Sequence, residues 1–248
     1  MNQVVVTGMV ISTVPVGEYD RRVVLLTKER GKISAFAKGA RRPSSHLIGV
    51  VTPFSFGEFT LYEGRSAYTL VQASISNYFN ELRENIEAAY YGFYFMDIAA
   101  YYTRENNDEM EVLKLLYQTL RALVSKRIDY SLVRYIFELK AICINGEGPQ
   151  VFQCVGCRDE NREQVFSPLK GGLICSGCSG GVVDGIHLDT STLYTLQYVV
   201  SSSIEKLYTF AVNDQVLQCF RHVIEGYMNI YVDKRFKSLE ILEQVLKD

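Results

Sequence analysis

The sequence predicts an α+β protein in which a five-stranded OB-type β-barrel precedes a helical domain with an inserted four-cysteine zinc ribbon. Three observations favour this fold class. Short apolar runs separated by turns fill residues 1–79, helical periodicity begins at residue 80, and glycines and cysteines interrupt that periodicity at about 147–186. We therefore expect an N-terminal domain over 1–79 and a helical domain over 80–248 that carries the insertion.

Five apolar runs in the first domain are typical of strands. The third run alternates apolar and polar residues, as a half-buried strand does, and Gly57 is a possible bulge in the fourth. The longest connection, 39–49, lies between the third and fourth runs, which suits a small closed barrel of the OB type. An SH3-like barrel of similar strand count is the alternative. The runs are Val4–Ile11, Arg22–Thr27, Lys32–Ala37, Phe54–Phe59 and Tyr68–Val71.

Apolar residues three or four positions apart predict helices in the second domain. The first stripe runs from Leu82 through Phe93 to Ala100, and further stripes cover 113–123 and 132–143. Helical periodicity resumes after the cysteines, at 193–200 and 216–230. The cysteine-rich segment has too few large apolar residues for a core of its own, so we interpret it as an insertion between helices.

Composition narrows the functional classes. The chain has 248 residues, 48% of them hydrophobic, and a net charge of −2, so any contact with phosphates must come from a local basic patch. No stretch of about 18 uncharged apolar residues occurs, and the N-terminus lacks the basic region of a signal peptide. Six cysteines without an export signal indicate a reducing, cytoplasmic setting, where paired cysteines more often bind metal than form disulfides.

Four cysteines carry the strongest chemical signal. They form two C-x2-C pairs separated by seventeen residues, and two such knuckles supply the four thiolates of a closed tetrahedral zinc site. Glycines inside both pairs, Gly156 and Gly177, help the turns to close. We expect one structural Zn²⁺ ion that organises a loop unable to fold by burial alone. The predicted ligands are Cys154, Cys157, Cys175 and Cys178.

Other roles for these cysteines are a degenerate metal site, redox chemistry or a catalytic metal. A catalytic zinc keeps a position open for water, whereas four thiolates close the shell, and a thioredoxin-type pair needs a βαβ context that the pattern lacks. His187 is close enough in sequence to be a spare ligand, but the four cysteines already complete the set. Cys143 and Cys219 lie on or beside apolar stripes and are interpreted as small core residues.

A basic cluster in the first domain is the second signal. Residues 1–80 contain nine Lys and Arg and five Asp and Glu, a local net charge of +4. Arginine can fork onto phosphate oxygens, and the loop glycine and serines can bring backbone N–H groups close to a phosphate. The expected contacts are Arg21, Arg22, Lys32, Lys38, Arg41 and Arg42.

Aromatic side chains in the same domain are candidates for base stacking, because an OB barrel binds single strands through a positive groove and aromatic faces. Tyr19, Tyr62 and Tyr68 are the preferred candidates, and Phe36 is interpreted as a core residue. We find no catalytic set: the three histidines lie in separate segments, and G-x-S-x-G, P-loop and H-E-x-x-H motifs are absent. We therefore expect a protein that is not an enzyme and that acts through binding energy.

The residues resemble those of the RecO family of bacterial recombinational repair. Three parts carry the resemblance: the segment Glu18–Arg21 after the opening strand, the run Gly31–Pro43, and the cysteine pairs within a helical domain. The resemblance covers essentially the whole chain in length and order of parts. The run Ala37–Arg42 is its most specific piece, whereas cysteine pairs occur in many zinc proteins. After Pro43 the chain reads Ser-Ser-His, where the family commonly has a basic residue.

The resemblance implies more than the spacing does. RecO-like proteins have an N-terminal OB barrel, bind single- and double-stranded DNA and anneal complementary strands in the RecF pathway. They act with RecR, contact the acidic C-terminal tail of single-strand-binding protein and help RecA to load onto coated DNA, so RecF and RecA are possible partners too. The family's basic motif falls on Lys32, Lys38, Arg41 and Arg42 of this chain. A nucleoid-associated, cytoplasmic location follows from the same resemblance.

Three other functions compete with this interpretation. An RNA-binding OB and zinc-ribbon protein of translation or transcription would share both signals, because RNA preference rests on stacking and 2′-OH contacts. A metal-dependent hydrolase would need a zinc with an exchangeable water. A pure adaptor would use the helical domain alone, with the barrel as scaffold.

Overall fold

The computed structural model describes residues 2–65, 67–160 and 164–247 and forms two compact units. The first contains 1–124 together with 236–248, and the second contains 125–235. These units follow spatial contacts, and their limits differ from the expected ranges 1–79 and 80–248. The division into those two domains remains a prediction.

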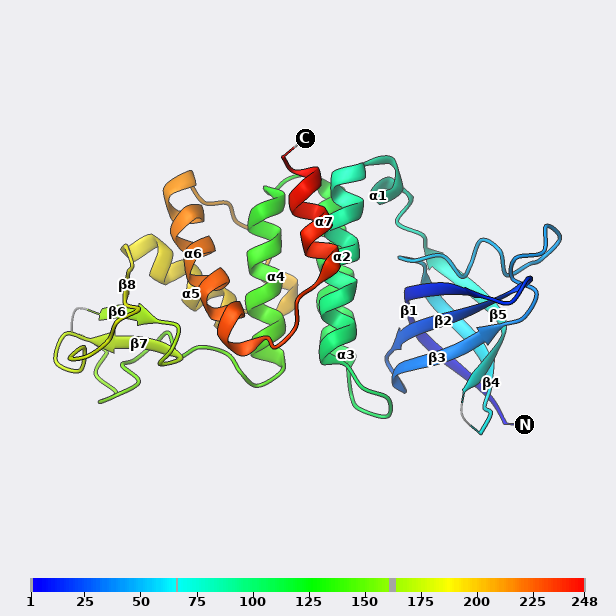
Figure 1. The fold of residues 1–248 in the computed structure, drawn as a ribbon, viewed down its shortest axis with the longest axis horizontal. Coiled ribbons are helices and arrows are strands. Elements are labelled where there is room, and N and C mark those ends of the chain that lie inside the picture. The colour runs from blue at the N-terminus through cyan, green and yellow to red at the C-terminus, as the bar shows by residue number, and fades with distance from the viewer. Residues whose placement is uncertain (1, 66, 161–163, 248) are drawn as a thin grey trace. The chain divides into compact units, whose positions relative to one another are not determined.

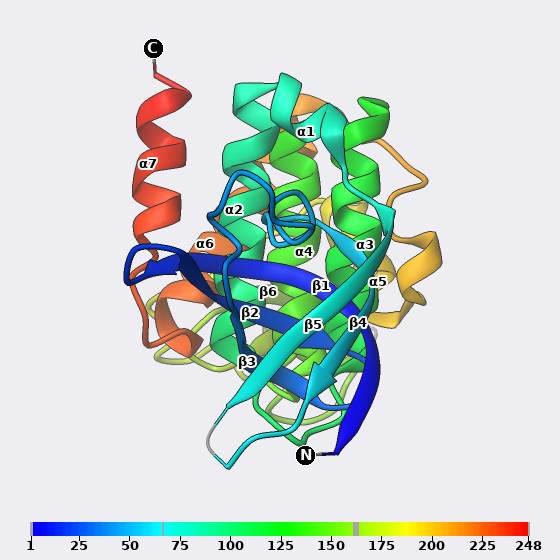
Figure 2. The same ribbon diagram turned by 90° about the vertical axis from the view of Figure 1, so that its right-hand side faces the viewer.

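A closed five-stranded barrel opens the first unit, which confirms the predicted fold class (Figures 1 and 2). Its hydrogen-bonded strand order is β1-β2-β3-β5-β4, in which β3 and β5 pair in parallel and close the barrel. The ladder between β4 and β5 shifts register between Phe56 and Gly57, where the sequence indicates a bulge. The strands are β1 (Gln3–Val16), β2 (Asp20–Thr27), β3 (Gly31–Ala37), β4 (Phe56–Tyr62) and β5 (Tyr68–Asn77).

The barrel core consists of the inward-pointing residues of each strand. On β3, for example, Ile33, Ala35 and Ala37 are buried while Phe36 between them is exposed. Phe54, expected in the fourth strand, instead precedes it with φ at +75°. Its ring is buried, lies 5.0 Å from the ring of Phe93, and occupies the space that a side chain at Gly92 would need. Phe54 thus connects the barrel to the helices of the same unit.

Helices α1 (Asn80–Glu84), α2 (Ile86–Tyr102) and α3 (Met110–Ser125) follow the barrel. The single helix expected from Leu82 to Ala100 is wrong, because Asn85 is extended and its side chain accepts a hydrogen bond from the N–H of Ala88. This cap starts a new helix. The expected stripe is also partly wrong: Phe93 is 41% exposed, and Tyr91, Phe95 and Ile98 on neighbouring positions are buried instead.

The C-terminal helix α7 (Lys237–Val245) was not expected from the sequence. It packs against α2, where the Ser238 hydroxyl donates to the Asp97 carboxylate at 2.8 Å and the Phe236 ring meets Tyr94 and Tyr101 edge-on. Only nine residues long, the helix has too short an apolar repeat to stand out in the sequence.

The second unit combines three helices with a small sheet. These helices are α4 (Tyr130–Ile144), α5 (Thr190–Ser201) and α6 (Asp214–Tyr231), with a 3₁₀ turn at Ile204–Lys206. Between α4 and α5 lies the three-stranded sheet β7-β6-β8, formed by β6 (Gln164–Ser167), β7 (Gly172–Cys175) and β8 (Ile186–His187). The predicted insertion between helices is therefore a ribbon. Among the described residues, no helix is both long and apolar enough to cross a bilayer.

Candidate nucleic-acid interface and metal centre

The basic loop after β3 is held against the turn between β1 and β2. The N–H of Gly39 donates to the Asp20 carboxylate at 2.7 Å, and the N–H of Arg41 donates to the Tyr19 carbonyl at 2.9 Å. The Arg41 guanidinium also donates to the Gly17 carbonyl at 3.1 Å. Gly39 has φ at +67°, a left-handed conformation that glycine adopts without strain. Two backbone N–H groups and the Arg41 side chain thus hold the loop against this turn. We call residues 38–42 the basic loop.

Cationic side chains of the basic loop face solvent. Lys38, Arg41 and Arg42 are exposed, as is Arg22 on β2, whereas Arg21 is half-buried at the mouth of the barrel. The Arg42 guanidinium lies over the Tyr19 ring, 5.0 Å from its centroid, a cation–π contact that orders an otherwise mobile side chain. The structure therefore brings five of the six predicted cations to this end of the barrel.

Two of the predicted contact residues lie elsewhere. The Lys32 ammonium donates to the backbone carbonyl of Ala100, at the end of α2, and is directed toward the helices. Tyr68 is only 6% exposed and belongs to the barrel core, and burial raises the pKa of its phenol. A buried ring offers no stacking face, so we leave Tyr68 and Lys32 out of the interface.

Three aromatic rings of the barrel remain exposed. Tyr19 is 43% exposed and Tyr62 is 36% exposed, as predicted for stacking candidates. A hydrogen bond to the Glu18 carboxylate raises the pKa of Tyr19. Phe36, interpreted from the sequence as a core residue, is 37% exposed on the outer surface of β3. The alternation of β3 could have indicated this, because Ala35 and Ala37 share the opposite face.

The four predicted metal ligands converge in the ribbon of the second unit. The sulfur atoms of Cys154, Cys157, Cys175 and Cys178 all lie within 4.8 Å of one another. Four thiolates at about 2.3 Å from one Zn²⁺ would have mutual separations close to 4 Å, so the cluster fits a single tetrahedral ion. Gly156 leaves room for the sulfurs, since a Cβ there would lie 3.2 Å from the Cys178 sulfur.

Backbone amides prepare the cluster for negative charge. Burial opposes ionisation of Cys154, but the N–H groups of Cys175 and Gly156 each donate to its sulfur at 3.3 Å, and together with further bonds they lower its pKa to about 6. Hydrogen bonds among the sulfurs raise the pKa of Cys178. Burial opposes ionisation of Cys175 too, but hydrogen bonds with Cys157 and Cys178 outweigh it and lower the pKa of Cys175. Neighbouring thiols that share protons in this way are suited to exchange them for a cation.

The remaining cysteines and His187 stand apart from this cluster. Within the part of the chain that the structure describes, the only group of metal-ligating side chains is the four cysteines. Burial raises the pKa of Cys143 to about 11, as expected for a packed thiol. Cys219 is partly exposed and directs its sulfur to the His187 carbonyl at 3.7 Å.

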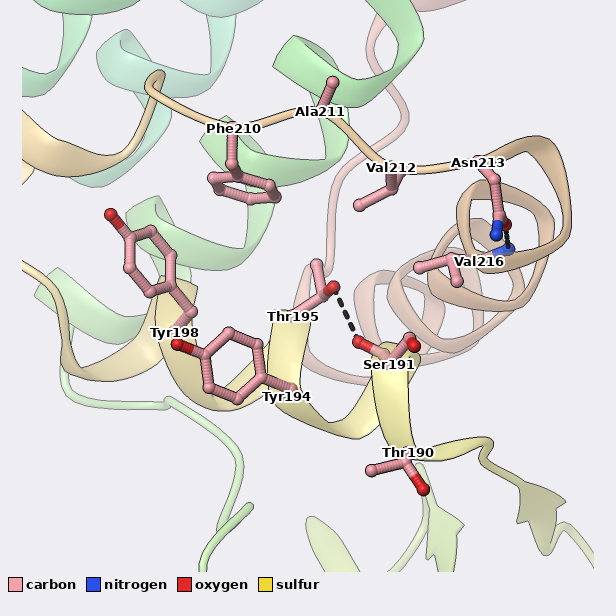
Figure 3. Close-up of a pocket in the computed structure, with 10 residues that line it drawn as sticks. All are labelled: Thr190, Ser191, Tyr194, Thr195, Tyr198, Phe210, Ala211, Val212, Asn213 and Val216. Carbon is pink, nitrogen blue, oxygen red and sulfur yellow. Dashed lines mark hydrogen bonds between the residues drawn. The ribbon is translucent and has the colours of Figure 1, made fainter.

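A separate pocket of about 620 Å³ lies beside α5 and the start of α6 (Figure 3). The rings of Tyr194, Tyr198 and Phe210 line one side of it, and Asn213 and Val216 lie at the other end. None of its lining residues carries a charge, so it does not offer the cations that a phosphate requires. We therefore keep the pocket separate from the candidate interface.

Comparisons with known proteins cover both halves of the chain. Residues 1–79 match the family model described as Recombination protein O N terminal, and 83–240 match Recombination protein O C terminal. A protein of Alkaliphilus metalliredigens named DNA repair protein RecO is 32% identical over 240 residues, which cover 96% of this chain and 98% of that protein. A protein of the same name from Acetivibrio thermocellus is 31% identical over 245 residues, or 98% and 97% of the two chains.

Proposed function

This chain belongs to the RecO family of DNA repair proteins, and from that membership we propose that it binds single- and double-stranded DNA and anneals complementary strands. The observation that carries the proposal is the basic loop, in which Lys38, Arg41 and Arg42 are exposed beside Arg22. Three hydrogen bonds, two from backbone N–H groups and one from the Arg41 guanidinium, hold the loop, so little conformational entropy is lost when the cations meet phosphates.

Annealing follows from electrostatics. Two single strands repel each other through their phosphates, and neutralisation on a cationic surface lowers the barrier to their meeting. Binding that releases counterions weakens as salt rises, with a log–log slope of roughly −0.7 for each single-strand phosphate contacted. The function requires no covalent chemistry, so we assign no catalytic residue.

The proposal includes protein partners and a structural metal. We infer that the chain acts with RecR, contacts the C-terminal tail of single-strand-binding protein and assists RecA loading, with RecF as a further partner. We assign one Zn²⁺ to Cys154, Cys157, Cys175 and Cys178, where the thiolates would supply a closed shell that braces the ribbon. The metal lies in the second unit and the basic loop in the first, so its role is to stabilise its own unit.

Charge reversal in the basic loop tests the proposal. Arg41→Glu combined with Arg42→Glu should lower the affinity for single-stranded DNA at least tenfold, flatten its salt dependence and slow annealing. The matched control is Lys126→Glu with Arg127→Glu, an exposed basic pair between α3 and α4, which should bind like the wild type. Equal affinity of the loop variant and the wild type, in chains that unfold at the same temperature, would refute the proposal.

Competition with RNA oligomers of the same sequence distinguishes this proposal from the RNA-binding alternative. A preference for RNA of tenfold or more would favour the function in translation or transcription, since only a 2′-OH contact distinguishes the two polymers at one site.

A further inference from the structure

A single row of paired residues crosses the barrel from β1 to β4. In the ladder register, each residue of the row lies directly opposite the next one on the neighbouring strand. Figure 2 shows these strands side by side. In order, the row consists of Val14 on β1, Arg22 on β2, Phe36 on β3, Thr69 on β5 and Tyr62 on β4.

The members on β2 to β5 point away from the barrel core, with Thr69 half-buried between the buried Tyr68 and Leu70, and Val14 lies on the exposed end of β1. Val14 is 46% exposed, Phe36 37% and Tyr62 36%, and Arg22 is also exposed. On β2, β3 and β4 the neighbours of these residues point inward: Val23 beside Arg22, Ala35 and Ala37 beside Phe36, and Leu61 beside Tyr62 are buried. Because side chains alternate between the two faces of a strand, the row is an outward-facing line of side chains, which we call the aromatic row.

The aromatic row combines the two side-chain chemistries that a single strand of nucleic acid requires. Phe36 and Tyr62 present rings that can stack on bases, and Arg22 beside Phe36 can pair with a phosphate or stack as well. Thr69 separates the rings by two strand spacings, about 10 Å between α-carbons. Each ring therefore has room to accept its own base.

The row is also continuous with the basic loop. β3 ends at Ala37, so Phe36 lies two residues before Lys38, the first cation of that loop. Exposed aromatic residues occur on strands for reasons of β propensity alone. Here, however, two rings and an arginine share one row, and a cationic loop adjoins it. The complementary ligand has flat apolar faces and a polyanionic backbone.

We infer that the aromatic row stacks the unpaired bases of single-stranded DNA while the basic loop holds the phosphates. The inference rests on the proposed function and assigns the contacts with bases and the contacts with phosphates to two different surfaces. The bases of a duplex are already stacked on each other, so the row binds single strands and not duplexes. When two strands anneal, the product loses the row contacts and keeps only those with phosphates, which favours its release. Tyr19 lies in the turn between β1 and β2 and is not part of the row, and the Arg42 guanidinium of the basic loop covers its ring.

Three DNA probes of equal length test this inference by fluorescence anisotropy across a salt series: oligothymidylate, an abasic oligomer with the same phosphates, and a duplex. Phe36→Ala and Tyr62→Ala should each weaken oligothymidylate binding about tenfold at every salt concentration. Affinity for the abasic oligomer and for the duplex should stay within twofold of the wild type, and the salt slope should not change, because no charge is removed.

The conservative variants Phe36→Tyr and Tyr62→Phe keep the rings and should bind oligothymidylate like the wild type. Tyr194→Ala, which removes a 66% exposed ring from the second unit, should also have no effect. Wild-type affinity of the two alanine variants for oligothymidylate, or equal losses with the abasic oligomer, would overturn the inference. A different result would refute the proposed function itself: the charge-reversal variant at Arg41 and Arg42 would then bind every probe like the wild type.

Discussion

The carboxylate of Asp20 accepts a hydrogen bond from the backbone N–H of Gly39 at 2.7 Å, and this bond links the turn between β1 and β2 to the basic loop. An acidic residue at the centre of a cationic surface opposes the binding of phosphate. Its presence there is consistent with a structural role, because the bond fixes the loop at the residue whose φ is +67°.

Replacement of Asp20 separates these two effects. Asp20→Ala should weaken DNA binding by about threefold to tenfold, since the lost bond is worth about 1 kcal/mol in loop order. If Asp20 acted only through its negative charge, its removal would instead strengthen DNA binding. Glu18→Ala removes the same charge from the same turn without this bond and should leave affinity unchanged or slightly increased. Asp20→Asn keeps an acceptor and should restore binding. Tighter binding by Asp20→Ala in an anisotropy titration would disprove the anchoring role.

Gly31, the first residue of β3, is held close to the connection between α2 and α3. Its φ is +62°, and a Cβ there would lie 2.2 Å from the Arg104 carbonyl oxygen. Gly31→Ala should therefore destabilise the first unit by about 2–4 kcal/mol. This cost has two parts: the left-handed conformation of an alanine, and the displacement of the carbonyl that the new Cβ would meet. Gly17→Ala has a similar φ of +57° but no atom within 4 Å, and should cost about 1 kcal/mol. Urea unfolding measures the free energy of unfolding of both variants. An equal loss of stability in the two would show that the close contact at Gly31 adds nothing.

The cysteine cluster predicts a specific metal content. The purified chain should contain one Zn²⁺ per molecule, with sulfur as its only ligand atom in X-ray absorption spectra. Cys154→Ser should abolish tight binding and lower the unfolding temperature of the second unit, as should a strong chelator. Cys143→Ser, outside the cluster, should retain the full metal content. A nitrogen or oxygen ligand in the spectrum would show that the four thiolates do not complete the shell and would favour the hydrolase alternative.

Local patterns in the sequence predict the barrel and the metal ligands well, for physical reasons. Two C-x2-C pairs specify a tetrahedral cluster without knowledge of the rest of the chain, and alternating strands such as β3 indicate their own inner face. The structure confirms the five-stranded barrel, and the four cysteines meet as predicted.

Features that depend on distant contacts could not be predicted in this way. Lys32 resembles its basic neighbours in sequence, yet its ammonium reaches a carbonyl 68 residues away. Phe36 and Tyr62 come together only because β3 and β5 close the barrel in parallel, which places Thr69 between them. The break at Asn85 also escapes a periodicity argument, since apolar residues continue on both sides of it.

Asp189 provides a test of pH dependence in the second unit, at the N-cap of α5. Its carboxylate accepts hydrogen bonds from the Thr192 hydroxyl at 2.5 Å and from the N–H groups of Ser191 and Thr192 at 2.8 and 3.0 Å. The Thr192 hydroxyl and these amides hold the pKa of Asp189 below its usual range. A carboxyl whose pKa is lower in the folded than in the unfolded chain stabilises the fold above about pH 4 and loses that contribution as the pH falls.

Asp189→Ala should therefore lower the free energy of unfolding by about 1 kcal/mol at pH 7, and the difference from the wild type should shrink as the pH falls from 4 to 2. Thermal unfolding at a series of pH values measures this difference. Asp189→Asn caps the helix without titrating, so its free energy of unfolding should lie between those of the wild type and the alanine variant at pH 7 and exceed that of the alanine variant at every pH. Metal release in acid affects all three chains alike and cancels in the comparison. A constant gap between wild type and Asp189→Ala down to pH 2 would show that the hydrogen-bonded carboxylate contributes nothing through its charge.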